Sequence, residues 1–297
     1  MRNHWKKVLV AFCLVLTGTI ANLGTDKNWC FPENDLYIPV TTNKERVLSM
    51  DEATFNHVID VVEDIYKPIV KDLGGDLQVI RKWEDGTVNA YAQRSGSVYK
   101  VSMFGGLARH ATVTKEGFAL VVCHEVGHHI GGFPKKTSWL GTSSWASNEG
   151  QADYWGTSKC MKKVLESLAE DPALEEEEYD DYQYALKACG KTFTNQHDQY
   201  ICARNSMAGK SLAELFRALR KLPKELRFID RDKKVVTSTS HSHPAPQCRM
   251  DTYFSGSLCS KGSDEVISDT DEALGFCYSE GKYESNERPS CWFKEKK

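Results

Sequence analysis

The apolar positions along the chain repeat mainly with the period of an α-helix, and two short stretches indicate strands. Residues 50–73 predict an amphipathic helix, because apolar side chains recur every three or four positions at Phe55, Val58, Ile59, Val62, Ile65 and Tyr66. Strands are expected at Leu77 to Lys82 and at Val98 to Met103. Further helices are expected over residues 114–130, 145–168 and 182–220. The pattern therefore predicts an α+β fold that is mainly helical and contains a small β-sheet.

The predicted helix over residues 114–130 is the most apolar of these elements. Thr114 is suited to cap its first turn, and the run from Phe118 to Val122 is suited to a buried element. Gly131 and Gly132 are typical of a helix end. We therefore expect a central helix, followed by an exposed loop over residues 131–144 that joins it to the next helix.

The N-terminus has the pattern of a secretory signal peptide. Arg2, Lys6 and Lys7 precede the apolar run Val8 to Leu16, and Thr19 to Ala21 is a plausible cleavage site. The alternative is an uncleaved anchor, for which the apolar run is short. After residue 21 no apolar run approaches the roughly 20 residues that a membrane span requires. We expect a signal peptide over residues 1–21, one domain over 22–259, and an irregular tail over 260–297 stapled by cysteines.

Nine cysteines follow residue 21, which is typical of an exported protein in an oxidising compartment, periplasmic or extracellular. They are Cys30, Cys123, Cys160, Cys189, Cys202, Cys248, Cys259, Cys277 and Cys291. We expect four disulfides, without assigning their pairing, and one free thiol. Cys123 is the candidate for the free thiol because it lies inside the apolar helix.

The charge pattern excludes nucleic acid as a partner. The formal net charge is −3, and removal of the three basic residues of the signal peptide would change it to −6. Basic residues are interspersed with acidic ones and form no strong run. A mildly acidic exported chain with no membrane span after signal cleavage is expected.

The segment His124-Glu125-Val126-Gly127-His128 supplies the components of a zinc site. Two histidines four residues apart lie on one face of a helix, so both imidazoles can reach one ion. Glu125 is rotated by about 100° from His124 and can lean over the open side of the ion as a general base. An isolated motif of this kind also occurs on ordinary helix surfaces.

A catalytic zinc ion needs three protein ligands and one open position. Glu149, at the start of the next predicted helix, is the best candidate for the third ligand. Asp153 lies one turn further on, where it can accept the free ring N–H of a zinc-bound histidine. The expected cofactor is therefore one zinc ion per chain.

These motifs, over about residues 55 to 255, resemble the glutamate-zincin group and within it the M48 family of Ste24/HtpX-like metallopeptidases. Besides the metal motif, the similar segments are Asn89-Ala90-Tyr91-Ala92, Ala152-Asp153 and Ser242-His243-Pro244 followed by Arg249. The resemblance implies a zincin-type fold with a metal-binding helix and a second ligand helix. Many members span membranes and few have this many cysteines, so the expectation here is an exported member without a membrane span.

The resemblance also implies roles for residues outside the metal motif. His243 matches the family's His-Pro segment and is expected to stabilise the oxyanion of the reaction, with His241 as the competing candidate. Asn89, Ala90 and Tyr91 are expected to align a polypeptide substrate as an added strand. Arg249 is expected to contact substrate or, equally, to form a structural ion pair.

The sequence thus predicts a zinc-dependent endopeptidase that acts on extended or unfolded polypeptides. Zinc would lower the pKa of a water molecule to about 7, and Glu125 would accept its proton. Two other classes stay open at this point. One is a secreted zinc-binding protein without turnover, and the other is a zinc hydrolase of a non-peptide amide.

Overall fold

The computed structural model describes residues 27–40, 50–137, 143–169, 179–279 and 285–295. The predicted signal peptide, with Cys13, lies outside the described residues. The helices are α1 (Glu52–Asp72), α2 (Gly105–Ala108), α3 (Lys115–Ile130), α4 (Glu149–Trp155), the π-helical turn η1 (Gly156–Cys160), α5 (Met161–Ser167), α6 (Tyr179–Thr192), α7 (Gln196–Leu219) and α8 (Pro246–Leu258). The strands are β1 (Asn28–Trp29), β2 (Asp76–Lys82), β3 (Ala90–Ser95), β4 (Val98–Phe104), β5 (Lys135–Thr137) and β6 (Ser143–Ser147). The predicted α+β class with a small sheet is confirmed.

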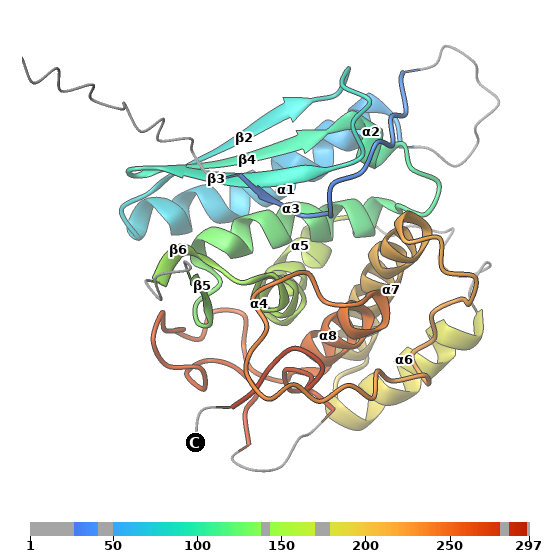
Figure 1. Ribbon diagram of the computed structural model, residues 1–297. Helices are drawn as coiled ribbons and strands as arrows, with labels where there is room; N and C mark the ends of the chain where they lie inside the picture. The colour runs from blue at the N-terminus through green and yellow to red at the C-terminus, as the bar shows by residue number, and fades with distance from the viewer. Residues whose placement is uncertain (1–26, 41–49, 138–142, 170–178, 280–284, 296–297) are drawn as a thin grey trace, which may run out of the picture.

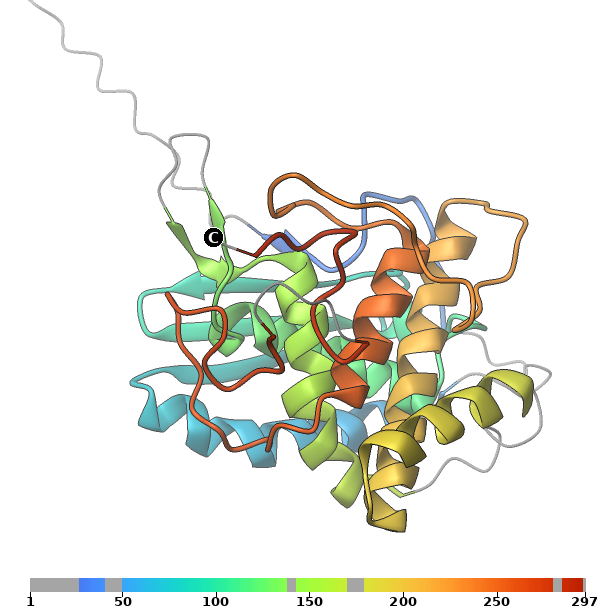
Figure 2. The ribbon, with the colours of Figure 1, turned by 90° about the horizontal axis from the view of Figure 1, so that it is seen from below.

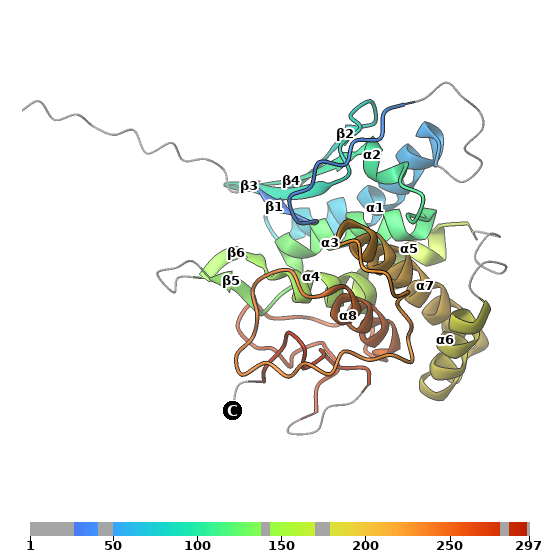
Figure 3. The same cartoon turned by 45° about the vertical axis from the view of Figure 1, so that its right-hand side comes forward.

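The four-stranded sheet has the order β1-β3-β4-β2. The pairs β1–β3 and β3–β4 are antiparallel, whereas β2 and β4 run parallel. Figure 1 shows the sheet above α1 and α3, and the 45° turn of Figure 3 shows β1 at the edge of the sheet beside β3. The edge strand expected at Asn89 to Ala92 is therefore paired on both sides, because the N-terminal segment adds β1 to it.

Helix α3 forms the middle layer of the molecule. Figure 1 shows the sheet and α1 on one side of it and α4, α5, α7 and α8 on the other. In the view from below, helices of this second group lie in front of the sheet (Figure 2). Its residues from Glu116 to His129 are all buried. The Thr114 side chain accepts a hydrogen bond from the backbone N–H of Gly117, as the cap prediction requires. The prediction that the apolar run Phe118 to Val122 lies at the centre is confirmed, because helices and strands pack around it.

The second ligand helix begins later than expected. Residues 143–147 form β6 rather than helix, and β6 pairs with β5 across part of the segment predicted to be an exposed loop. Gly132 has the positive φ (77°) expected after a helix end, whereas Gly131 continues in a right-handed conformation. The hairpin gives backbone partners to groups that a loop would leave to water.

Four disulfides link the described cysteines, as expected. They join Cys123 to Cys160, Cys189 to Cys202, Cys248 to Cys291, and Cys259 to Cys277. The prediction that Cys123 is the free thiol is wrong. Neighbouring residues of a helix diverge by about 100°, so Cys123 can reach Cys160 of η1 while His124 faces Glu149 and Asp153 of α4. Among the described cysteines, the buried Cys30 has no disulfide partner.

The tail beyond residue 260 contains no helix or strand among its described residues. It is fastened by the two disulfides that involve Cys277 and Cys291, and Phe276 and Trp292 are buried against the body of the protein. Within the residues that the structure describes, no helix has the length and apolarity that a membrane crossing needs.

Mass spectrometry after alkylation tests this pairing. Iodoacetamide added to denatured, unreduced protein should label Cys30 and none of the eight disulfide-bonded cysteines, because a cysteine in a disulfide does not react. Peptide mapping should recover the Cys123–Cys160 bridge. Labelling of Cys123 together with loss of that bridge would contradict the structure.

Candidate metal centre

Three side chains from two helices converge in the interior. His124 and His128 lie one turn apart on α3, and Glu149 is the first residue of α4. The ligand atoms of the three lie within 4.8 Å of one another. The Nε2 atom of His124 is 3.3 Å from Oε2 of Glu149, and that of His128 is 3.7 Å from Oε1. Ligands at about 2.1 Å from a tetrahedral zinc ion are about 3.4 Å apart, so these separations suit one ion.

The helices approach closely enough for this because a glycine lies between the two histidines. A Cβ atom at Gly127 would lie 2.9 Å from the Trp155 ring and 3.3 Å from the backbone of Ala152. The start of α4 is fixed by Asn148, whose side chain accepts a hydrogen bond from the backbone N–H of Gln151. Local capping and the missing side chain thus bring Glu149 to the histidines.

The second ring nitrogen of each histidine is also engaged, which turns Nε2 toward the shared site. His128 Nδ1 donates to the backbone oxygen of Ser147 at 2.8 Å. His124 Nδ1 lies 2.7 Å from Oδ1 of Asp153. Partners of this kind fix the tautomer and orientation of metal-binding histidines. The structure therefore places Asp153 where the sequence predicted it.

Asp153 is held by two residues of α8. Arg249 Nη2 lies 2.5 Å from Asp153 Oδ1, and the Tyr253 hydroxyl donates to the same oxygen at 2.8 Å. Arg249 is fully buried and lies over the Phe216 ring at 3.8 Å. Of the two roles expected for Arg249, the structure shows the ion pair. Tyr253 was missed by sequence reasoning, since only the fold brings α8 to α4.

A second observation, independent of the spacing between the ligand atoms, also indicates that the donor set fits a divalent cation. Several buried polar atoms around the site have no hydrogen-bond partner, among them Nε2 of His124, Nε2 of His128, Oε2 of Glu149, and both carboxyl oxygens of Glu125. Buried polar atoms without partners are rare and costly, and a bound ion with its water would satisfy them. Two imidazoles and one carboxylate with an adjacent free carboxyl match a zinc site with an open position.

Charge at the site follows from burial and from Lys136. Burial acts to raise the pKa of Glu149, but Lys136, His128 and His243 lower it well below the usual value, so the group is a carboxylate. The Lys136 Nζ atom lies 2.7 Å from Glu149 Oε1. Burial holds the pKa of His128 well below its usual value, which leaves a neutral imidazole suited to bind a metal. Lys136 was not predicted from the sequence.

Glu125 lies beside the ligands without joining them. Its carboxyl group is fully buried, and burial raises its pKa to about 8. A carboxyl group with a pKa near neutrality is well matched to accept and return a proton. This is the position that the sequence predicted for a general base.

His243 lies at the edge of the site. Its Nε2 atom is 3.4 Å from Glu149 Oε2 and donates to the backbone oxygen of Trp29 at 2.9 Å. Its side chain is 27% exposed, whereas the metal-ligand side chains are at most 1% exposed. The competing candidate His241 does not belong to any metal-binding group among the described residues.

The predicted substrate-aligning residues contact the N-terminal segment of the same chain. Ala90 O accepts a hydrogen bond from Cys30 N at 3.0 Å, and Tyr91 pairs with Trp29 across β3 and β1. The Asn89 side chain bonds both the N–H and the carbonyl oxygen of Phe31, at 3.1 and 3.3 Å. Nothing in the sequence indicated that residues 27–31 lie here.

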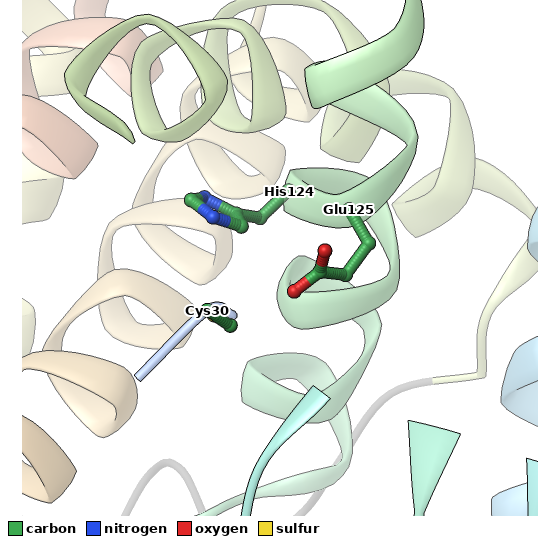
Figure 4. Close-up of side chains that lie close together, drawn as sticks. All are labelled: Cys30, His124 and Glu125. Carbon is green, nitrogen blue, oxygen red and sulfur yellow. The ribbon is translucent and has the colours of Figure 1, made fainter. Parts of the chain in front are cut away.

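Cys30 is a further residue near the site that was not predicted from the sequence. Its sulfur lies within 4.8 Å of ligand atoms of both His124 and Glu125, and Figure 4 shows the three side chains together. Burial raises the pKa of its thiol to about 11. The odd number of cysteines indicated one free thiol but could not locate it. A third potential group, Asp232 with Cys248 and Cys291, cannot bind a metal in this form because its cysteines form a disulfide.

No family model, curated protein or solved structure matches this chain. The zincin-type fold and the M48 resemblance therefore stay predictions that rest on the motifs and on the arrangement described above.

Metal analysis of single variants tests the centre. His124→Ala, His128→Ala and Glu149→Ala should each lose stoichiometric zinc, because each removes one of three ligands. Asp153→Ala should weaken zinc affinity by roughly 10- to 100-fold, as loss of a histidine partner does. Affinity is measured by competition with a chromophoric chelator. The exposed His197 on α7, changed to alanine, is the control. Full zinc in Glu149→Ala would show that another residue is the third ligand.

Proposed function

We propose that this protein is an exported zinc-dependent endopeptidase that hydrolyses peptide bonds in extended or unfolded polypeptides. The observation that carries the proposal is the buried Glu125 carboxyl group, which has no hydrogen-bond partner and lies beside the His124, His128 and Glu149 donor set. A site that only stores zinc has no need for such a group.

When bound, a zinc ion supplies Lewis acidity that lowers the pKa of water to about 7 and polarises a carbonyl group. His124, His128 and Glu149 would hold the ion. Glu125 would accept the proton of the attacking water and then deliver it to the leaving nitrogen. Burial raises its pKa above the usual range of a carboxyl group, which brings it closer to the neutral pH at which both transfers would occur.

His243 is suited to stabilise the negative charge that develops on the carbonyl oxygen. In the structure its Nε2–H already donates to a backbone carbonyl oxygen, that of Trp29, at 2.9 Å. The donor is thus aimed at an extended strand next to Glu149. A fixed donor of this kind contributes roughly 10²- to 10³-fold to the rate of acyl transfer.

An extended polypeptide is the substrate class that the surroundings favour. Strand β3 already accepts one extended segment in antiparallel pairing, and Asn89 bonds its backbone rather than a side chain. Backbone pairing gives affinity for extended chains with little dependence on sequence.

One observation favours the alternative of a zinc-binding protein without turnover. The Cys30 sulfur lies beside His124 and Glu125, where it could complete a closed set of four ligands. Closed four-ligand sites are typical of structural zinc.

The general-base variant separates these functions. Glu125→Gln should retain stoichiometric zinc, because the residue is not a ligand, and should lose at least about 10²-fold in hydrolysis of an unfolded protein. His243→Ala should also retain zinc and lose roughly 10²- to 10³-fold. Fluorescent casein provides the assay, and metal analysis accompanies each measurement. His241→Ala is the matched control and should be as active as wild type.

Equal activity of wild type and Glu125→Gln would contradict the proposed mechanism. So would a complete lack of hydrolysis by zinc-loaded protein, in both wild type and Cys30→Ser. The second variant is included because it frees the site of the Cys30 sulfur.

A further inference from the structure

We propose that the N-terminal segment Trp29-Cys30-Phe31 is a built-in inhibitor that occupies the substrate strand position, with the Cys30 thiolate as fourth ligand of the metal ion. The inference rests on the proposed function, which it extends to the regulation of the same site. It follows from the contacts of three consecutive residues.

The backbone of the segment is bound as a substrate strand would be. Both polar backbone groups of Cys30 are used: its N–H donates to Ala90 O at 3.0 Å, and its carbonyl oxygen accepts from Arg249 Nη1 at 3.1 Å. Both groups of Phe31 bond the Asn89 side chain. The segment therefore uses the β3 edge residues that a polypeptide substrate would need, and the two cannot bind together.

The preceding carbonyl group meets the proposed oxyanion donor. Trp29 O accepts from His243 Nε2 at 2.9 Å, and the Trp29 ring lies 4.8 Å from that of Tyr91. His243 is therefore also engaged by the segment. While His243 Nε2 donates to Trp29 O, it is not available to the carbonyl oxygen of an incoming chain.

The thiol lies next to the metal-ligand residue His124 and to Glu125. Cys30 Sγ and ligand atoms of His124 and Glu125 lie within 4.8 Å of one another, and the unpartnered Glu125 oxygens are fully buried beside it (Figure 4). A thiolate is a preferred zinc ligand, and an ion deprotonates a thiol that coordinates it. On coordination the Sγ–H bond breaks, the sulfur–metal bond forms and the proton passes to solvent. The thiolate then stands where Glu125 would otherwise activate water.

Phe31 anchors the thiol in place. Its ring is fully buried and stacks on Phe216 of α7, with 4.7 Å between ring centroids. A tethered ligand competes with water at a high effective concentration, so one thiol suffices to close the site. If the segment were withdrawn in about one molecule in 100, apparent substrate affinity would fall about 100-fold.

Cobalt(II) substitution tests the ligand directly and does not depend on activity. The full chain loaded with cobalt(II) should show near-ultraviolet thiolate-to-cobalt absorption, and Cys30→Ser should lose it while keeping the visible bands of tetrahedral cobalt. Asp35→Asn, at an exposed position four residues after Phe31, is the control and should absorb like wild type. Wild type without the thiolate band would overturn the proposal.

Hydrolysis by zinc-loaded protein tests the inhibition. Cys30→Ser should cleave fluorescent casein about 10- to 100-fold faster than wild type, and Asp35→Asn should not. A Cys30→Ser variant no faster than a measurably active wild type would overturn the inhibitory role. If the thiolate band is present but neither protein hydrolyses casein, the peptidase function fails and Cys30 is the fourth ligand of a closed zinc site.

A second variant leaves the cysteine in place. It tests the proposal even if the Cys30→Ser variant fails to fold. Phe31→Ala removes the anchor, so the segment should withdraw more often and casein hydrolysis should rise. Native-state alkylation of Cys30 in Phe31→Ala should be about ten-fold slower, or more, with zinc than after chelation, because a coordinated thiolate is withheld from the reagent. Equal alkylation rates would show that burial alone protects the thiol. Thermal unfolding of each variant checks that the fold is retained.

Discussion

The buried carboxylate of Asp153 is the interaction on which the rest of the metal centre depends. It lies next to His124 on one side, and it is held by Arg249 and Tyr253 from α8 on the other. A buried ion pair that loses one partner leaves an uncompensated charge, which is costly in the interior. The carboxylate therefore fixes α4 against α8 and His124 against both. The orientation of one imidazole is thus tied to the packing of three helices.

The metal centre is also where the fold leaves polar groups without partners. The ligand atoms of His124, His128 and Glu149 that face one another include three without a hydrogen-bond partner. The adjacent Glu125 carboxyl group is equally unpartnered. The cost of burying such groups is concentrated at one point, and a divalent cation with a polar fourth ligand would offset it. Unpartnered ligand atoms that face one another distinguish a binding site from an ordinary buried polar network.

The N-terminal segment relates the proposed binding of substrate to the proposed inhibition of the same site. The features proposed for substrate binding, namely a strand edge, a side-chain amide and a histidine donor, are all engaged by residues 29–31 of the same chain. Such occupation shows that the site accepts an extended backbone in antiparallel register. It also explains why the predicted metal ligands are almost fully buried. On this proposal, the contacts of residues 29–31 that bury the site are also the contacts that inhibit it.

The sequence by itself determined most of the helices and the metal motif, because both are set by local periodicity. Helix spacing places His124 and His128 on one face, Thr114 caps the helix, and Glu149 and Asp153 are one turn apart whatever surrounds them. The α+β class followed from the same periods. The roles of Glu125 and His243 were suggested by motif and stay predictions.

Only the tertiary structure decided which residues meet across the chain. The partner of Cys123 depends on how α3 packs against η1, and the choice between two roles for Arg249 depends on where α8 lies. Lys136 reaches Glu149 from a hairpin that was expected to be a loop. The free cysteine beside the metal ligands is Cys30 and not Cys123, the cysteine predicted to be free, which lies 93 positions further along the chain. Local sequence fixes which face of a helix a side chain occupies, but contacts between distant segments depend on packing over the whole core.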